Sequence, residues 1–223
     1  MKDKHKTQTS EINSKLKISG NIDKNRLEAL SDGVFAIVMT ILVLEIKIQP
    51  LPHNSLDNGV LLWSEISKQA PVFISFLTTF AITTMYWIGH HNLFHLFTKN
   101  INRTLMEINM LFLMCVCILP FLSSLIGAYS YNQTALILYG LGIFITGLVM
   151  YLMYEYAKKS KEIENIAINQ LILRKIQIRI LLPIICSFTA IFVSYINLNA
   201  SFVILFAPVV FNTIPGSLSF IDE

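Results

Sequence analysis

The chain has 223 residues, of which 54% are hydrophobic and only 14% are charged, with a formal net charge of +3 at pH 7. Ordinary soluble domains contain about 25% charged residues, so this composition excludes a typical water-soluble enzyme and indicates an integral membrane protein. The small positive charge does not indicate nucleic-acid binding, because seven of the 17 basic residues lie within the first 26 positions. We therefore expect a lipid bilayer as the surroundings and no nucleic-acid partner.

The N-terminal residues 1–25 are basic and polar, and they contain no short apolar core followed by small residues. This pattern does not fit a cleaved signal peptide. We expect residues 1–25 to form a cytoplasmic basic tail and residues 26–223 to form one transmembrane domain.

Six apolar segments follow this tail. They run approximately from Leu30 to Ile48, Val72 to Ile88, Ile108 to Ala128, Ala135 to Tyr154, Ile178 to Ile196 and Ala200 to Ile214. All but the last are close to the roughly 20 residues that a helix needs to cross a bilayer, and the short sixth segment contains Pro208. Barrel strands would instead alternate over about ten residues. The sequence therefore predicts an all-α membrane protein with six transmembrane helices.

The basic residues predict the orientation of these helices. With a cytoplasmic N-terminus, 15 of the 17 basic residues fall on the inner side, and only Lys47 and Lys68 fall outside. Because positively charged loops remain in the cytoplasm, we expect both termini inside and the protein in the plasma membrane. A longer outer loop is expected around "QPLPHNSLDNGV", residues 49–60.

The first apolar segment carries a stripe of side chains that share one helix face. The stripe consists of Gly33, Ile37, Thr40, Ile41 and Leu44. An ordinary interpretation is that it packs against neighbouring helices, that Ser31 or Asp32 caps the helix start, and that Arg26 reaches the lipid headgroups. Periodicity alone favours this interpretation.

A resemblance to a known protein family favours a different interpretation of this stripe. The stretch "RLEALSDGVFAIVMTILVLEI" resembles the first-helix signature of the prokaryotic branch of the lysosomal potassium-channel family (transmembrane protein 175 type), which reads Arg, three residues, Phe-Ser-Asp. Arg26, Ser31 and Asp32 match, whereas Leu30 replaces the Phe. The blocks "YWIGHHNLFHLF" and "INMLFLMCVCILPF" extend the resemblance into the next two helices.

The resemblance implies a passive, potassium-permeable monovalent cation channel whose pore is lined by the first helix. The signature occurs once in this chain, which implies a homotetramer with four first helices around one axis. By position, Ile37 would form the apolar constriction, Thr40 a ring of hydroxyl oxygens, and Ile41 and Leu44 further apolar rings. The chain has no "TVGYG"-like loop for a carbonyl filter, so we expect modest selectivity for the permeant K⁺.

Two groups of polar residues, one at the start of the first helix and one at the outer side of the membrane, are expected to have separate roles. The resemblance implies that Arg26, Ser31 and Asp32 form a bracing network with His90 or His91, and the sequence does not decide between the two histidines. At the outer mouth, Glu45, Asp57 and Glu65 would raise the local cation concentration. The alternative for these three carboxylates is a solvated surface.

Two other function classes compete with the channel. A secondary transporter of small cations or solutes would usually show internal repeats, and none is detectable here. A membrane metalloenzyme would use His91 and His95, which share a helix face, but neither the adjacent Glu of a helical metalloprotease nor a third ligand accompanies them. We therefore expect no enzymatic activity, no metal site and no cofactor.

Overall fold

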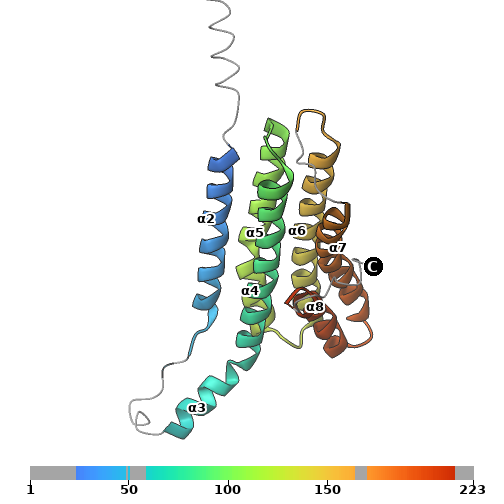
Figure 1. Ribbon diagram of the computed structural model, residues 1–223. Helices are drawn as coiled ribbons and strands as arrows, with labels where there is room; N and C mark the ends of the chain where they lie inside the picture. Colours follow the sequence, from blue (N-terminus) through green and yellow to red (C-terminus); the bar gives the residue numbers. More distant parts are fainter. Residues whose placement is uncertain (1–23, 49, 51–58, 164–169, 214–223) are drawn as a thin grey trace, which may run out of the picture.

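The computed structural model describes residues 24–48, 50, 59–163 and 170–213, which are nearly all helical and contain no strand (Figure 1). The helices are α2 (Lys24–Leu42), the 3₁₀ turn η1 (Val43–Glu45), α3 (Gly59–Lys68), α4 (Ala70–His91), the π-helical turn η3 (Asn92–Phe97), α5 (Arg103–Ala128), α6 (Gln133–Lys159), α7 (Gln170–Val193) and α8 (Leu198–Thr213). The predicted all-helical fold is thereby confirmed.

Within the described residues, five helical stretches are long and apolar enough to cross a membrane. They are Lys24–Glu45, Ala70–His95, Arg103–Ala128, Gln133–Lys159 and Leu173–Val193. The sixth predicted segment forms α8, which has 16 residues. At about 1.5 Å per residue, this helix is shorter than the roughly 30 Å of a hydrocarbon core. The sixth membrane span therefore stays a prediction.

The first helix is placed differently from the sequence prediction. It is already helical at Lys24, where an ion pair of 3.7 Å joins Lys24 to Glu28 one turn further along. Ser31 and Asp32 consequently lie in the third turn, so the prediction that one of them caps the helix start is wrong. At the other end η1 finishes at Glu45, and Ile46 is extended. Apolarity marked the membrane-facing part of this helix but not its polar first turns.

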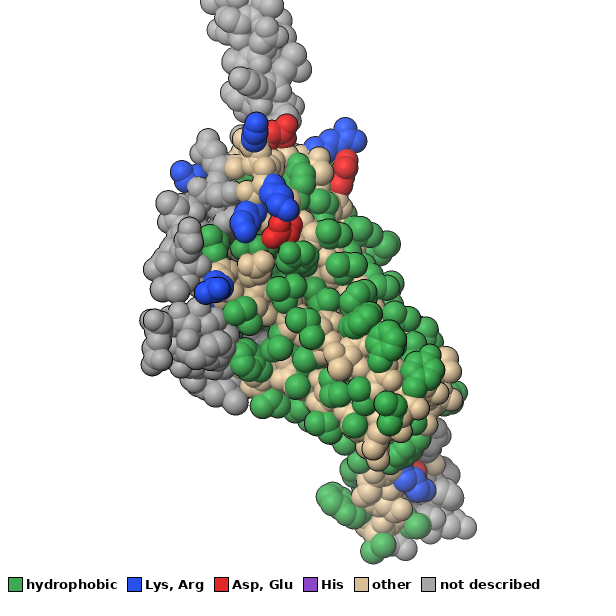
Figure 2. All heavy atoms as spheres, turned by 90° about the vertical axis from the view of Figure 1, so that its right-hand side faces the viewer, with side chains coloured by type: hydrophobic (Ala, Val, Ile, Leu, Met, Phe, Trp, Pro, Cys, Tyr) green, Lys and Arg blue, Asp and Glu red, His purple; other side chains and the backbone are tan. Residues whose placement is uncertain are grey.

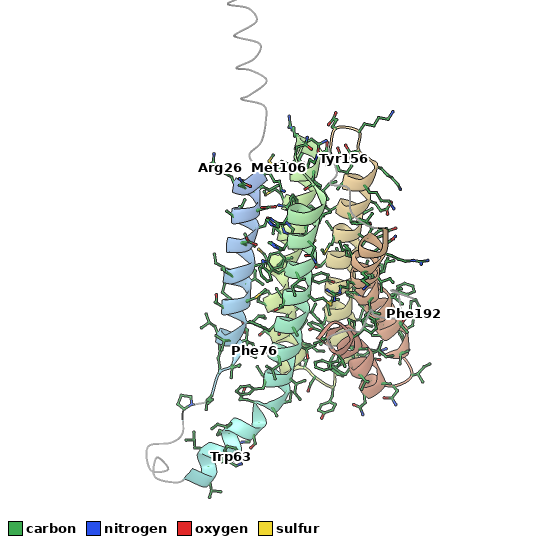
Figure 3. All side chains as sticks on the ribbon, viewed as in Figure 1. Arg26, Trp63, Phe76, Met106, Tyr156 and Phe192 are labelled. Atoms are coloured by element: carbon green, nitrogen blue, oxygen red, sulfur yellow. The ribbon has the colours of Figure 1, made fainter. Side chains whose placement is uncertain are left out.

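Helix α3 is an element that the sequence analysis missed. It begins at Gly59, at the end of the predicted outer loop, and most of that loop (residues 51–58) lies outside the described residues. Figures 1 and 3 show α3 projecting away from the other helices, with Trp63 near its middle. Trp63 and Val60 are 70% and 77% exposed. A search for runs of about 20 apolar residues does not detect a ten-residue helix.

The remaining helices form a bundle around α5. Helix α5 packs between α4 and α6, α7 packs on α6, α8 packs on α7, and α2 lies along α4 and α5 at one edge (Figure 1). The core is formed largely by side chains of α5 and α6, such as Phe112 and Met150. Helix α4 adds Tyr86, α7 adds Ile184, and Phe35 of α2 reaches into it. Figure 2 shows Lys and Arg side chains gathered toward one end, above a band of hydrophobic side chains.

Gly147 permits the close contact between α6 and α7. A Cβ atom at this position would lie 2.7 Å from Cγ1 of Ile184 and 3.1 Å from the Tyr86 hydroxyl oxygen. That hydroxyl donates a 2.7 Å hydrogen bond to the carbonyl oxygen of Ile143, so it has little freedom to move. We expect Gly147→Ala to lower the free energy of unfolding by about 1–3 kcal/mol through overpacking.

Thermal unfolding of the purified protein in detergent tests this expectation. Gly33→Ala is the matched control, because a Cβ atom at Gly33 would have nothing within 4 Å. The control should leave the Tm unchanged or raise it slightly, since Ala favours a helix over Gly. Equal Tm values for the two variants would contradict a close approach of α6 and α7 at Gly147.

Candidate functional site

One face of α2, and of the turn η1 that continues it, is not covered by the other residues that the structure describes. Every member of the predicted stripe is exposed or nearly so: Gly33, Ile37, Thr40, Ile41 and Leu44. Ile37 is 59% exposed and Leu44 is 65% exposed, whereas Phe35, Val38 and Leu42 on the opposite face are at most 4% exposed. The interpretation that the stripe packs against neighbouring helices of the same chain is therefore wrong. The stripe faces away from the other described helices.

The exposed face has a definite chemical order along the helix. Ile37 presents a branched apolar side chain, Thr40 follows one turn later, and Ile41 and Leu44 continue the apolar surface. The Thr40 hydroxyl donates a 2.8 Å hydrogen bond to the carbonyl oxygen of Ile37. Because its proton is directed to the helix backbone, the oxygen lone pairs of Thr40 remain available to a cation on the exposed side.

A chain of buried hydrogen bonds fixes the inner face of α2 at Ser31. The Ser31 hydroxyl donates to the carbonyl oxygen of Leu27 at 2.9 Å and accepts from the Asn109 amide nitrogen at 3.1 Å. The Asn109 amide oxygen is 2.8 Å from Nε2 of His90. Since that oxygen can only accept, Nε2 of His90 carries the proton. Three helices, α2, α5 and α4, are joined through these side chains.

Aromatic rings enclose the imidazole of His90. The ring stacks on Phe94 with 4.5 Å between centroids and on Phe112 with 5.7 Å and an interplanar angle of 6°. Phe35 of α2 lies 6.0 Å away. His90 is only 1% exposed. Its single described hydrogen-bond partner is Asn109, so the imidazole joins α4 to α5 directly and to Ser31 through that amide.

Asp32 makes a second, separate contact with α4. The indole Nε1 of Trp87 donates a 2.8 Å hydrogen bond to Oδ1 of Asp32. Trp87 in turn lies against His91, with 5.9 Å between ring centroids. His91 is exposed and does not reach the Ser31 chain. The two candidate histidines therefore occupy different environments: His90 is buried beside Ser31, and His91 is on the surface beside Trp87.

Arg26 joins neither set of contacts among the described residues. It is exposed at the start of α2, and Figure 3 shows it at that end of the helix. Lys24 provides the contact at this end instead, because its ammonium group donates to the carbonyl oxygen of Thr98 at 2.8 Å. The structure thus places Ser31, Asp32 and His90 within one region and Arg26 outside it.

The predicted carboxylates of the outer mouth are unevenly placed. Glu45 lies at the end of η1, next to the exposed face of α2, and it is partly exposed. Glu65 is on α3, where it forms an ion pair with Lys68 that offsets its charge. Asp57 lies outside the described residues. Glu45 is therefore the described carboxylate best placed to act at the end of the stripe.

The histidine pair on α4 and η3 has no further ligand beside it. His91 and His95 stack with 5.0 Å between ring centroids. Within the described ranges, no group of three or more His, Cys, Asp or Glu side chains is placed to hold a metal ion. The arrangement fits two stacked rings at the surface of the membrane-spanning helix.

Two residues of this region were not assigned to the bracing contacts by the sequence analysis. Asn109 interrupts the apolar run of α5 and is fully buried. A lone amide in such a run is a usable signal, because polar side chains in membrane helices commonly hydrogen-bond to another helix. Trp87 gave no comparable signal, since Trp is common at membrane surfaces for other reasons.

Comparisons with known proteins cover most of the chain. A sequence profile for the family described as endosomal/lysosomal potassium channel TMEM175 matches residues 26–120. A potassium channel of Chryseobacterium sp. (strain P1-3) is 30% identical over 178 residues, which cover 79% of this chain and 87% of that protein. The endosomal/lysosomal proton channel TMEM175 of Danio rerio is 28% identical over 194 residues, and the match spans 84% of this chain but only 36% of that protein.

A solved structure is also similar. The crystal structure of a lysosomal potassium-selective channel TMEM175 homolog from Chamaesiphon minutus matches with a TM-score of 0.70 and 27% sequence identity. The match covers 84% of this chain and 95% of that chain. The profile match begins at Arg26 and includes α2, α4 and most of α5. The contacts of Ser31 and Asp32 with α4 and α5 therefore lie inside the matched region.

Proposed function

This chain belongs to the TMEM175 family of potassium channels, and we propose that it conducts potassium and other monovalent cations passively through a pore lined by the exposed face of α2. The family consists of ion channels rather than enzymes. The observation that carries the proposal is the exposure of the stripe, since Ile37 and Leu44 are 59% and 65% exposed on a helix whose other face is buried.

Four copies of the chain complete this pathway in our proposal. A single α2 cannot enclose a pore, whereas closed rotational symmetry brings identical faces together around one axis. The stripe on α2 then becomes the inner wall, and the bundle of α4 to α8 lies outside it. The location of α2 at one edge of the protomer supports this arrangement (Figure 1).

The residues along the stripe have different roles in the pore. A ring of Ile37 side chains forms a narrow apolar neck, which an ion crosses only at the cost of shedding water. The Thr40 hydroxyl oxygens then replace part of the lost hydration. Few fixed ligands line the path, so selectivity for K⁺ over Na⁺ is modest. Passive conduction of this kind requires no cofactor and no resident metal ion, and K⁺ is the ion that passes through the pore.

The contacts of Ser31 and Asp32 keep the stripe turned toward the axis. Ser31 is linked to Asn109 and His90, and Asp32 is linked to Trp87. Because these are neighbouring positions bonded to two different helices, rotation of α2 about its own axis would break both sets. We assign these side chains a positioning role rather than direct contact with ions.

The protein lies in the plasma membrane with both termini in the cytoplasm under this proposal. The positive charge at one end supports the orientation. Lys24 begins α2, Arg103 begins α5 and Lys159 ends α6, and these three helix ends lie on the same side of the bundle (Figure 1). Glu45 then faces the outer entrance, where its carboxylate attracts cations. A continuous α2 from Lys24 to Leu42 favours a channel over a transporter with a broken central helix.

Potassium flux into proteoliposomes tests the proposal through a matched pair of threonines. The hydroxyls of Thr40 and Thr189 are both exposed and each donates a 2.8 Å hydrogen bond to a backbone carbonyl of its own helix. We expect the wild type to pass potassium and Thr40→Val to change the K⁺ to Na⁺ flux ratio several-fold. Thr189→Val, on α7, should match the wild type.

Two results would count against the proposal. If the wild type passes neither potassium nor sodium down a gradient, passive conduction is wrong for this chain. If it conducts but Thr40→Val and Thr189→Val behave alike, conduction stands and the α2 face is not its wall.

A further inference from the structure

Arg179 is a charged residue inside an apolar helix. It lies in α7, six residues beyond the start of the membrane-spanning stretch Leu173–Val193. At about 1.5 Å per residue, its Cα atom is roughly 9 Å into that stretch. Charged side chains at such positions are rare because of the cost of desolvation, and they pair with an opposite charge or reach water. The guanidinium of Arg179 therefore requires an anionic partner or access to water.

Among the described residues, this side chain has a cavity beside it and no carboxylate in the lining of that cavity. The Nε atom of Arg179 is buried and has no hydrogen-bond partner among the residues that the structure describes. The side chain borders a cavity of about 280 Å³ between α4, α6, α7 and α8. No carboxylate is among the lining residues, and the only uncharged polar side chains other than Tyr86 are Thr84 and Asn92. The Tyr86 and Thr84 hydroxyls are already directed at backbone carbonyls.

We propose that this cavity binds the phosphate group of an anionic phospholipid. A guanidinium offers paired N–H donors that match phosphate oxygens, and the pairing strengthens where water is scarce. The remaining walls are apolar, with Ile88 from α4, Ile176 from α7 and Val209 from α8. An acyl chain gains from such walls, whereas a free inorganic anion would lose its hydration and gain only the single charge.

The charge around the cavity also fits a lipid from one leaflet. Arg174 and Lys175 precede Arg179 on α7 and lie nearer the start of that helix. Basic residues beside a membrane attract anionic lipids. They would raise the local concentration of such lipids at the entrance, and the guanidinium of Arg179 would hold the phosphate. The inference does not depend on whether the protein conducts ions.

Lipid retention measured by native mass spectrometry tests the site. The full-length protein is equilibrated with mixed micelles containing phosphatidylglycerol or phosphatidylcholine, and the bound lipid is counted per chain. We expect the wild type to retain phosphatidylglycerol with a several-fold preference, and Arg179→Gln to lose that preference. Arg103→Gln is the control and should keep it, because Arg103 is exposed at the start of α5 and does not line the cavity.

Each other outcome overturns the proposal. An undiminished preference in Arg179→Gln, or an equal loss in Arg103→Gln, would show that general positive charge recruits the lipid. Displacement of the lipid by excess inorganic phosphate would show a site for free anions. If neither lipid is preferred by the wild type, the guanidinium is satisfied in another way, for example by a carboxylate of a neighbouring copy of the chain.

The Tm of the wild type in two lipids provides a second test, which remains valid if Arg179→Gln fails to fold. The Tm of the wild type should be higher in micelles doped with phosphatidylglycerol than in micelles doped with phosphatidylcholine, because a ligand that binds the folded state stabilises it. Arg179→Lys keeps the charge but loses the paired donors, so its Tm difference should be smaller than that of the wild type. Equal Tm values for the wild type in the two lipids would refute the site.

Discussion

Ile37→Asn is expected to raise potassium flux through the channel by roughly tenfold, which corresponds to a barrier lowered by only about 1.4 kcal/mol. The side chain at this position is exposed on the face of α2 that we assign to the pore. An amide in place of the branched apolar side chain allows water to enter the neck, so an ion keeps more of its hydration there. Potassium flux into proteoliposomes measures the change.

Ile185→Asn provides a control matched in residue type and exposure. Ile185 lies on α7 and is 58% exposed, against 59% for Ile37. Both variants place an amide on an exposed helix face, but only Ile37 faces the proposed axis. We expect Ile185→Asn to conduct like the wild type, after correction for the amount of protein incorporated. A tenfold rise in both variants, or in neither, would contradict Ile37 as the constriction.

His90→Phe is expected to lower the free energy of unfolding by about 1–2 kcal/mol. The phenyl ring keeps the stacking on Phe94 and Phe112 but cannot donate to Asn109, whose buried amide oxygen is then left without a partner. Because the same amide also bonds Ser31, the contact between α2 and α5 loosens as well. Thermal unfolding in detergent measures the loss of stability.

The neighbouring histidine supplies the comparison. His91 is exposed, and its described ring contacts are with Trp87 and His95. We expect His91→Phe to change the free energy of unfolding by less than about 0.5 kcal/mol, as for other surface substitutions. If His91→Phe lowered the free energy of unfolding more than His90→Phe does, the assignment of His90 as the histidine that stabilises the packing of α2 would be contradicted.

The general architecture follows from simple sequence signals. Long apolar runs identified all the helices of the bundle, because a membrane helix must be apolar on nearly every face. The 3.6-residue period also grouped Ile37, Thr40 and Leu44 on one face, and this face is exposed in the structure. The sequence alone could not say whether that face meets other helices of the same chain, because both arrangements use apolar side chains.

Other features depended on information that is not local. The polar first turns of α2 are helical because Lys24 contacts Glu28 and the carbonyl oxygen of Thr98, which is 74 positions away. The choice between His90 and His91 depends on which side of α4 meets α5, and the hydrophobic pattern of α4 is too uniform to show it. Asn109 could have been flagged as a buried amide, but its partners could not have been named without the packing of α2.

The accessibility of α2 to a water-soluble cationic thiol reagent tests most directly whether α2 lines the pore. The native thiols Cys115, Cys117 and Cys186 are first replaced by Ser, and potassium flux of this background is confirmed. Single cysteines are then introduced as Leu44→Cys on η1, the 3₁₀ turn that continues α2, and as Phe192→Cys on α7. The native side chains at these positions are 65% and 58% exposed. We expect the reagent to block flux through Leu44→Cys and to leave flux through Phe192→Cys unaffected. Block of Phe192→Cys with Leu44→Cys insensitive would contradict a pore lined by α2.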